Sequence, residues 1–155
     1  FYNLLKMTDP EKNVSLLEVP PHRILPLRHS VLRAGRPLEE ALFDGDDAPG
    51  TLHFGAFITD ECTSCLSLIK SNFEGKPAYQ LRGMATLPEY AKKGIGRSLL
   101  DFAISTAEHL PVWCNARTES AGFYTKAGWA ESGTPFNIEG IGPHVTMLYL
   151  PVKQS

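Results

Sequence analysis

The stretch Ala85-Thr86-Leu87-Pro88-Glu89-Tyr90-Ala91-Lys92-Lys93-Gly94-Ile95-Gly96-Arg97-Ser98 decides the fold prediction. It joins a strand-like run that ends at Thr86 to an apolar helical pattern that begins near Gly96. Two glycines let the backbone approach a ligand closely, and the free amides at the start of a helix favour an anion. Two lysines and an arginine add positive charge at the same point. The stretch therefore predicts a phosphate-binding loop that suits a pyrophosphate.

A lone Gly-x-Gly is explained equally well by an ordinary strand-to-helix turn. The two common nucleotide motifs do not fit this stretch. A Walker loop needs Gly-Lys-Ser or Gly-Lys-Thr after a longer spacing, and a dinucleotide fingerprint needs a third glycine and an acidic residue about twenty positions further on. The residues around the loop must therefore decide which ligand it holds.

Strand-like and helical patterns lie on both sides of the loop. Strands are predicted at 14–19, in two runs between Leu52 and Lys70, at 78–86, at 112–115 and at 145–150. Helices are predicted at 22–32, within 38–43, at 98–110 and at about 118–127, where Gly128 ends the last one. This order predicts a single α/β (α+β) domain over residues 7–155. Residues 1–6, which precede Met7, are interpreted as an upstream extension.

The composition is that of an ordinary globular protein. The chain has 155 residues, 43% of them hydrophobic and 21% charged, and a formal net charge of -2. A charge this close to zero predicts no nucleic-acid partner. No apolar run approaches the roughly 20 residues that span a bilayer, and no signal peptide is recognised, so we expect a cytoplasmic protein without a membrane partner.

The three cysteines are an odd number, so we expect reduced thiols rather than a disulfide framework. Cys62 and Cys65 invite a zinc or redox interpretation, but a zinc site of this kind needs a second pair of ligands. If the segment is a strand, positions three apart point to opposite faces. We therefore predict no metal site, and we expect Cys114 to be a buried, inert thiol.

Motifs on both sides of the loop follow one another in a recognisable order. They are Leu81-Arg82-Gly83-Met84-Ala85-Thr86, the loop itself, Cys114-Asn115-Ala116-Arg117, Ala121, Phe123-Tyr124 and Gly128-Trp129. This set resembles the GNAT family of N-acetyltransferases, most specifically from about Tyr79 to Trp129. The resemblance implies a mixed, mostly antiparallel central sheet of about six to seven strands flanked by helices. Two of the strands would splay to form a cleft for acetyl-CoA.

The resemblance also implies an activity. The protein would be an N-acetyltransferase that moves the acetyl group of acetyl-CoA to a primary amine of a small molecule or protein, by direct attack of the amine on the thioester. A non-catalytic acyl-CoA-binding module would share the cofactor residues and never turn over. A nucleotide-binding module of another class would be stabilised by ATP or NAD and not by acetyl-CoA. Both a monomer and a homodimer are compatible with the sequence.

The same resemblance assigns the acetyl-CoA site. The pantetheine arm would bond to the backbone at Met84 and Thr86 and to the side chain of Asn115. The full set of implied cofactor residues is Met84, Ala85, Thr86, Lys92, Lys93, Gly94, Ile95, Gly96, Arg97, Ser98, Asn115 and Tyr124. Ala91 stands where the family usually has Gln or Arg, which removes a side chain but none of the amides. We expect Lys92 or Lys93 to supply the missing polar contact.

Two side chains are candidates for proton transfer. The resemblance implies that Tyr124 donates a proton to the leaving thiolate, while a backbone amide near Met84 stabilises the oxyanion. Taken alone, Tyr124 would be an ordinary core aromatic residue. His144, after the Gly- and Pro-rich stretch 138–143, is the first candidate for the general base, and a water relay or no base is the alternative. A lone histidine is more often a hydrogen-bonded structural residue.

Four further residues are weaker candidates for contacts with the substrate: Arg82, Arg117, His53 and Glu139. His53 and Glu139 are the reserve candidates for the base, and the two arginines would contact an anionic substrate or the cofactor. Each also has an ordinary explanation as a solvated, ion-paired or hydrogen-bonded residue. Asp46 and Arg33 are weaker candidates still.

Overall fold

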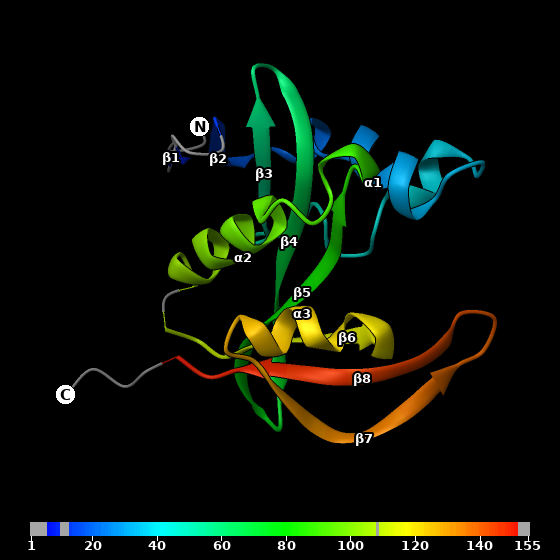
Figure 1. Cartoon of the computed structure of the whole chain (residues 1–155). Coiled ribbons are helices and arrows are strands. Elements are labelled where there is room, and N and C mark those ends of the chain that lie inside the picture. Colours follow the sequence, from blue (N-terminus) through cyan, green and yellow to red (C-terminus); the bar gives the residue numbers. More distant parts are fainter. Residues whose placement is uncertain (1–5, 10–12, 108, 152–155) are drawn as a thin grey trace. The chain divides into compact units, whose positions relative to one another are not determined.

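The computed structural model describes residues 6–9, 13–107 and 109–151 (Figure 1). Its contacts divide the chain into two compact units. Unit 1 contains residues 1–69 and 81–104, and unit 2 contains residues 70–80 and 105–155. Two long strands, β4 (Glu61–Phe73) and β5 (Lys76–Thr86), contribute residues to both. Each unit is therefore described by itself.

Unit 1 is built on antiparallel strands. β1 (Lys6–Asp9) pairs with β2 (Val14–Val19), β2 pairs with β3 (Leu52–Ile58), and β3 pairs with β4. The register of β3 and β4 shifts between Ala56 and Phe57, where β3 has an irregularity. Its helices are α1 (Leu25–Leu32) and α2 (Ile95–Ser105), with short 3-10 turns η1 (Pro21–Arg23), η2 (Leu38–Ala41) and η3 (Pro88–Tyr90).

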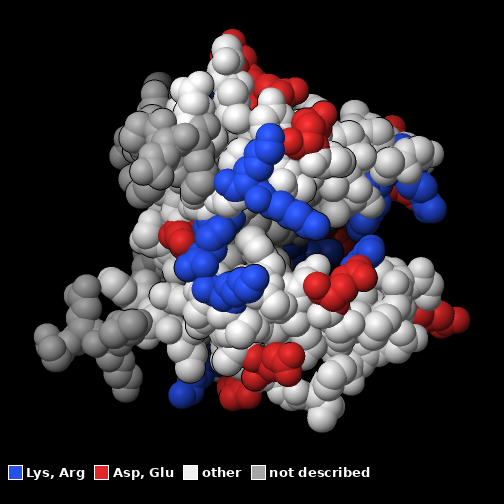
Figure 2. Space-filling model, in the orientation of Figure 1, with Lys and Arg blue, Asp and Glu red and all other residues white. Residues whose placement is uncertain are grey.

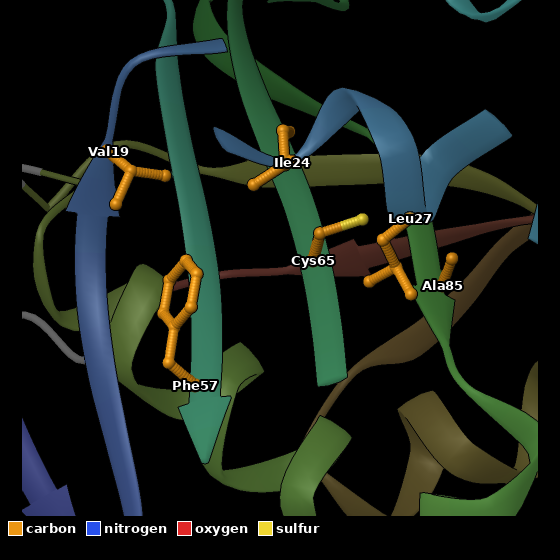
Figure 3. Packing of buried hydrophobic residues seen from close by; sticks show 6 residues of the cluster. All are labelled: Val19, Ile24, Leu27, Phe57, Cys65 and Ala85. Atoms are coloured by element: carbon orange, nitrogen blue, oxygen red, sulfur yellow. The ribbon is translucent and has the colours of Figure 1, made fainter. Parts of the chain in front are cut away.

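Apolar packing attaches both helices of unit 1 to its strands. Figure 3 shows six buried side chains that meet beneath α1: Val19, Ile24, Leu27, Phe57, Cys65 and Ala85. Ile24 and Leu27 are three positions apart and so lie on one helical face. On α2 the rings of Phe102 and Phe54 of β3 meet edge to face at 5.8 Å. These contacts hold both helices against the strands of unit 1, including α2, which follows the predicted phosphate loop.

Unit 2 is built around β6 (Val112–Arg117). This strand pairs in parallel with β5 at Tyr79↔Val112 and Gln80↔Trp113, and antiparallel with β8 (Gly142–Tyr149) along its whole length. β8 also pairs with β7 (Ala130–Ile138) in the long hairpin seen in Figure 1. Between β6 and β7 lie η4 (Thr118–Ser120) and α3 (Ala121–Lys126). Gly128, with φ 93°, follows α3 in the left-handed conformation that commonly ends a helix.

The α/β class and the mostly antiparallel sheet are confirmed. The first predicted strand matches β2 at both ends. Eight strands are present in the described part of the chain, and β1 and β7 have no counterpart among the predicted elements. β7 was missed because seven of its nine residues are exposed, so it lacks the alternation of a half-buried strand. Residues 1–5 of the expected upstream extension lie outside the described residues, whereas Lys6 begins β1.

Several predicted boundaries were wrong. α1 begins at Leu25 rather than at residue 22, because Pro26 suits the first turn of a helix and not its interior. α2 covers 95–105 rather than 98–110, and His109 beyond it has φ 64°. β8 begins at 142 rather than 145. No helix in the described part of the chain is long and apolar enough to cross a membrane.

Candidate functional site

The predicted phosphate loop connects β5 to α2 within unit 1. Lys92 and Gly94 have positive φ angles of 61° and 81°, so two positions just before the helix are in the left-handed region. The first backbone bond of α2 runs from the N–H of Ser98 to the carbonyl of Gly94 at 3.0 Å. In the first turn of an α-helix the N–H groups have no partner inside the helix. The loop therefore ends in donors that suit an anion.

Cationic side chains surround this loop. Lys92 and Lys93 are exposed, and the Lys93 ammonium lies 5.8 Å from the ring centre of Tyr90. Tyr90 in turn donates a hydrogen bond to the Glu61 carboxylate at 3.1 Å. Arg97 pairs with Asp101 one turn along α2 at 3.0 Å, and both side chains are largely exposed. Figure 2 shows Lys and Arg side chains exposed on the face of the molecule viewed there.

The end of β5 is anchored by side chains of β4. Ser64 donates a hydrogen bond to the carbonyl of Ala85 at 3.1 Å, and its hydroxyl lies 2.8 Å from that of Thr86. Cys65 donates to the carbonyl of Gly83 at 3.6 Å. Met84 and Thr86 are partly exposed, whereas Ala85 is buried. The predicted pantetheine strand therefore has a defined conformation within unit 1.

In unit 2, Asn115 lies on β6 with its side chain exposed. Its carbonyl oxygen accepts a hydrogen bond from Thr146 of β8 at 2.9 Å, and the two residues are register partners. A carboxamide with an occupied oxygen still presents two N–H donors. The hydrogen bond from Thr146 therefore orients the Asn115 carboxamide with its oxygen toward β8 and leaves its NH2 group as the donor for a ligand.

Tyr124 is buried in unit 2 beside Cys114. Only 6% of Tyr124 is exposed, its ring packs 5.1 Å from that of Trp129, and its hydroxyl is hydrogen-bonded to the Cys114 thiol. Burial raises the pKa of Tyr124 well above its ordinary value of 10, and the neighbouring thiol raises it further. Burial also raises the pKa of Cys114 to about 12. Both groups are therefore protonated at neutral pH.

His144 lies on β8, also in unit 2. It is 6% exposed, its ring stacks on Phe136 of β7 at 6.0 Å, and its Nδ1 lies 2.8 Å from the carbonyl oxygen of Gly142. A carbonyl oxygen can only accept a hydrogen bond, so Nδ1 carries the proton. In the neutral ring Nε2 is then the atom with a free lone pair.

The other predicted contact residues lie in different surroundings. His53 is 2% exposed and both ring nitrogens are occupied, Nδ1 by Ser67 at 2.6 Å and Nε2 by the carbonyl of Asp46 at 3.0 Å. Glu139 is exposed in the turn between β7 and β8. Arg117 is exposed and 3.9 Å from Glu119, a weak surface pair. Arg82 is partly exposed in unit 1, and its guanidinium lies 4.8 Å from the ring centre of Phe43.

Sequence reasoning overlooked Arg28, whose side chain is 1% exposed inside unit 1. Its guanidinium binds Asp46 at 2.6 Å and 3.2 Å, Ser67 at 2.8 Å and the carbonyl of Ala41 at 2.9 Å. A signal for this burial is present in the sequence. Position 28 lies four residues after Ile24 and one after Leu27, so it falls on the apolar face of α1. A cation on such a face needs a buried acid.

Unit 1 also contains a cavity of about 400 Å³. Its lining is His22, Arg23, Pro26, Leu27, Ser30, Phe57, Asp60, Glu61, Cys62 and Leu87. None of the predicted site residues belongs to this lining. The cavity therefore adds no support to the predicted assignments. The three cysteines are free thiols, and the described residues include no group of three or more His, Cys, Asp or Glu that could hold a metal ion.

Comparison with known proteins decides what kind of protein has these features. A family model described as an acetyltransferase (GNAT) domain matches residues 34–150. The chain belongs to the GNAT acetyltransferase family. Its curated relative in Bacillus subtilis (strain 168), the uncharacterised N-acetyltransferase YitI, is 37% identical over 127 residues, which are 78% of this chain and 85% of YitI. The protein is thus an N-acetyltransferase, and its family transfers acyl groups from coenzyme A.

Solved structures support the fold of this acetyltransferase. A putative N-acetyltransferase from Lactobacillus plantarum superposes with a TM-score of 0.74 at 19% identity, covering 90% of this chain and 99% of that one. The Bacillus subtilis N-acetyltransferase YlbP, solved in complex with coenzyme A, has a TM-score of 0.52 at 23% identity, covering 64% of this chain and 67% of YlbP. At these identities the likeness concerns the fold, and the roles of individual residues must be argued from their own surroundings.

Proposed function

We propose that this enzyme moves the acetyl group of acetyl-CoA to a primary amine by direct attack of the amine on the thioester. The observation that carries the proposal is the loop ahead of α2, where two positive φ angles, the start of a helix and two exposed lysines converge. These features fit a pyrophosphate, and coenzyme A contains one. The complex of YlbP with coenzyme A is consistent with the assignment.

In this proposal the residues from Lys92 to Ser98 hold the pyrophosphate mainly through backbone N–H groups. Ala91 supplies no polar side chain, and the lysines that follow it compensate with charge. Met84, Ala85 and Thr86 hold the pantetheine arm through the backbone, and Asn115 donates from its amide nitrogen because its oxygen is bound to Thr146. The match to the family model spans residues of both units, which supports one catalytic domain.

The chemistry places three demands on the protein. The thioester supplies an electrophilic carbon and a thiolate leaving group, so the amine must be neutral, the oxyanion needs a donor and the thiolate needs a proton. We assign the oxyanion to a backbone amide near Met84. Tyr124 is assigned as the proton donor by its resemblance to the family motif, and its hydroxyl carries a proton at neutral pH. His144 is assigned as the base that accepts the amine proton at Nε2, since Nδ1 is engaged by Gly142.

The direct test is the release of free coenzyme A with a panel of amines, measured for the wild type and for Tyr124→Phe. We expect the variant to lose about 10²-fold in kcat or more, as for the loss of a general acid, with little change in the affinity for acetyl-CoA. Tyr149→Phe removes a hydroxyl from another ring that packs on Trp129 and serves as the control. An unchanged kcat for Tyr124→Phe would refute the assignment of the acid.

His144→Asn separates the role of Nε2 from that of Nδ1. The carboxamide nitrogen of Asn can replace Nδ1–H toward the Gly142 carbonyl but offers no base at the position of Nε2. We expect kcat to fall at neutral pH while the melting temperature stays close to that of the wild type. Equal losses of activity and stability would indicate a structural histidine instead.

A further inference from the structure

Three arginine side chains surround the ring of Phe43 in unit 1. The guanidinium carbons of Arg28, Arg82 and Arg33 lie 4.1 Å, 4.8 Å and 5.4 Å from the ring centre. These residues come from α1, from β5 and from the segment that follows α1. Each cation gains from the electron-rich face of the ring, but their like charges repel one another at such short separations.

Among the described residues, Arg28 is the one member of this trio that forms a salt bridge. Arg28 is buried and bound by the Asp46 carboxylate through two hydrogen bonds. Arg33 donates to the carbonyl of its neighbour Leu32 at 2.9 Å, and among the described residues neither Arg33 nor Arg82 has a carboxylate partner. The nearby Glu40 is bound through both oxygens by Arg36, at 2.6 Å and 2.9 Å. Two partly exposed guanidinium groups therefore face one ring without a salt bridge to any described carboxylate, and Glu40 attracts Arg33 only at longer range.

The support for this pair is rigid. Asp46 accepts a hydrogen bond from the backbone N–H of Phe43 at 2.8 Å, so the carboxylate that holds Arg28 also holds the residue that carries the ring. On the other side Gly83 packs so closely that a Cβ there would lie 3.0 Å from Phe43 and 3.0 Å from Arg28. Arg82 is the residue immediately before this glycine on β5, so its backbone position is set by the same packing. The cations are thus presented by a structure that is formed before any ligand arrives.

We propose that Arg33 and Arg82 bind a carboxylate of the acceptor, so that the acceptor is a small-molecule amine that also carries a carboxylate. Guanidinium groups offer planar pairs of N–H donors that match the two oxygens of a carboxylate. The inference rests on the proposed function, since it names the class of amine that the enzyme acetylates. The pyrophosphate of acetyl-CoA is assigned to the loop ahead of α2, which has cations of its own.

The test compares amines that differ only in the carboxylate. Lysine is paired with cadaverine and phenylalanine with phenethylamine, and kcat/KM is measured from the release of coenzyme A at saturating acetyl-CoA. We expect a preference of about tenfold or more for the carboxylate-bearing member, the size of one hydrogen bond to a charged group. Arg33→Gln and Arg82→Gln should each reduce this preference about tenfold, mainly through the KM of the acceptor.

Arg36→Gln is the matched control, because Arg36 lies in the same segment, is exposed and already has Glu40 as its partner. It should leave the preference unchanged. Arg82→Lys, which retains charge but loses the planar pair of donors, should retain part of it. Equal use of both members of each pair by a wild-type enzyme that turns over would overturn the inference and leave the proposed function intact. A higher kcat/KM for O-phosphoethanolamine than for the carboxylate-bearing amines would also overturn the inference.

A second measurement does not depend on turnover. The Nε–Hε NMR signals of the arginines are followed while N-acetylglycine or N-acetylglycinamide is added to the wild type and to Arg82→Gln. We expect the signals of Arg33 and Arg82 to move with the acid and not with the amide. If no amine releases coenzyme A, the proposed function fails, and the carboxylate site is still judged by these signals. Signals that respond to neither compound would refute it.

Discussion

The loop ahead of α2 and the arginine cluster around Phe43 both concentrate positive charge in unit 1, but by opposite means. In the loop, Lys92 and Lys93 are exposed and act together with backbone amides over a short stretch of chain. In the cluster, Arg28 is buried and its partner Asp46 lies 18 positions away. The first arrangement is local and solvated, whereas the second exists only when distant segments are packed together.

This difference predicts different consequences of mutation. Removing an exposed cation weakens an attraction that water and salt already screen. Removing the partner of a buried cation leaves a charge that water cannot reach, so the cost falls on the stability of the fold. The loop should therefore respond in ligand affinity and the cluster in the free energy of unfolding.

The largest effect is expected for Asp46→Asn. The variant retains the shape of the side chain but leaves the Arg28 guanidinium buried without a counter-charge, which typically costs about 3–5 kcal/mol. Denaturant unfolding measures the loss, and Asp47→Asn at the exposed neighbouring position should change little. Adding Arg28→Met to Asp46→Asn should recover part of the stability. A double variant less stable than the single one would show that the charge is not the cause.

Gly83→Ala should come next, and Gly75→Ala is its matched control. Both glycines have similar positive φ angles, 66° and 78°, so both substitutions carry the left-handed backbone strain of about 1 kcal/mol. A Cβ at position 75 meets nothing within 4 Å, whereas at position 83 it meets Phe43 and the anchored Arg28. We expect position 83 to cost a further 1–3 kcal/mol or so of unfolding free energy. Equal losses of unfolding free energy at the two positions would mean that Phe43 and Arg28 can move aside at little cost.

Exchanging both loop lysines for glutamine should have a smaller effect, and on a different quantity. We expect Lys92→Gln with Lys93→Gln to weaken acetyl-CoA binding about tenfold at low salt, or about 1.4 kcal/mol, with little change in stability. The difference from the wild type should shrink as salt is added, because the charges are exposed. Lys76→Gln, at the exposed first residue of β5, is the control. Calorimetric titration at two salt concentrations measures both effects.

The smallest effect concerns His53, which supports the cluster through Ser67. Burial lowers the pKa of His53 below its ordinary value of 6.5, so the unfolded chain takes up a proton there more readily than the folded protein. This histidine therefore favours the fold fully above pH 6.5, and the advantage is lost as the pH falls below that value. His53→Asn should lose less stability than the wild type between pH 7.5 and pH 5.5. The exposed His22→Gln should retain the wild-type dependence.

Much of the architecture could be predicted from the sequence, because it depends on local patterns. The alternation in 14–19 and the apolar spacing after Gly96 each identify an element without knowledge of its neighbours. Elements without such a pattern were missed, as with the exposed strand β7, which is defined by its pairing with β8. The end of α2 was wrong for a related reason, since the last turn of a helix depends on what it packs against.

The sequence by itself determined the family, the loop that we assign to the pyrophosphate and the residues named for proton transfer, because these lie in short motifs whose spacing is visible in the chain. Only the tertiary structure decided that Tyr124 is buried against Cys114, that both nitrogens of His53 are occupied, and that Arg28 forms a buried salt bridge while Arg33 and Arg82 form none with the described carboxylates. Burial and charge compensation depend on residues brought together from distant positions. No local pattern records them.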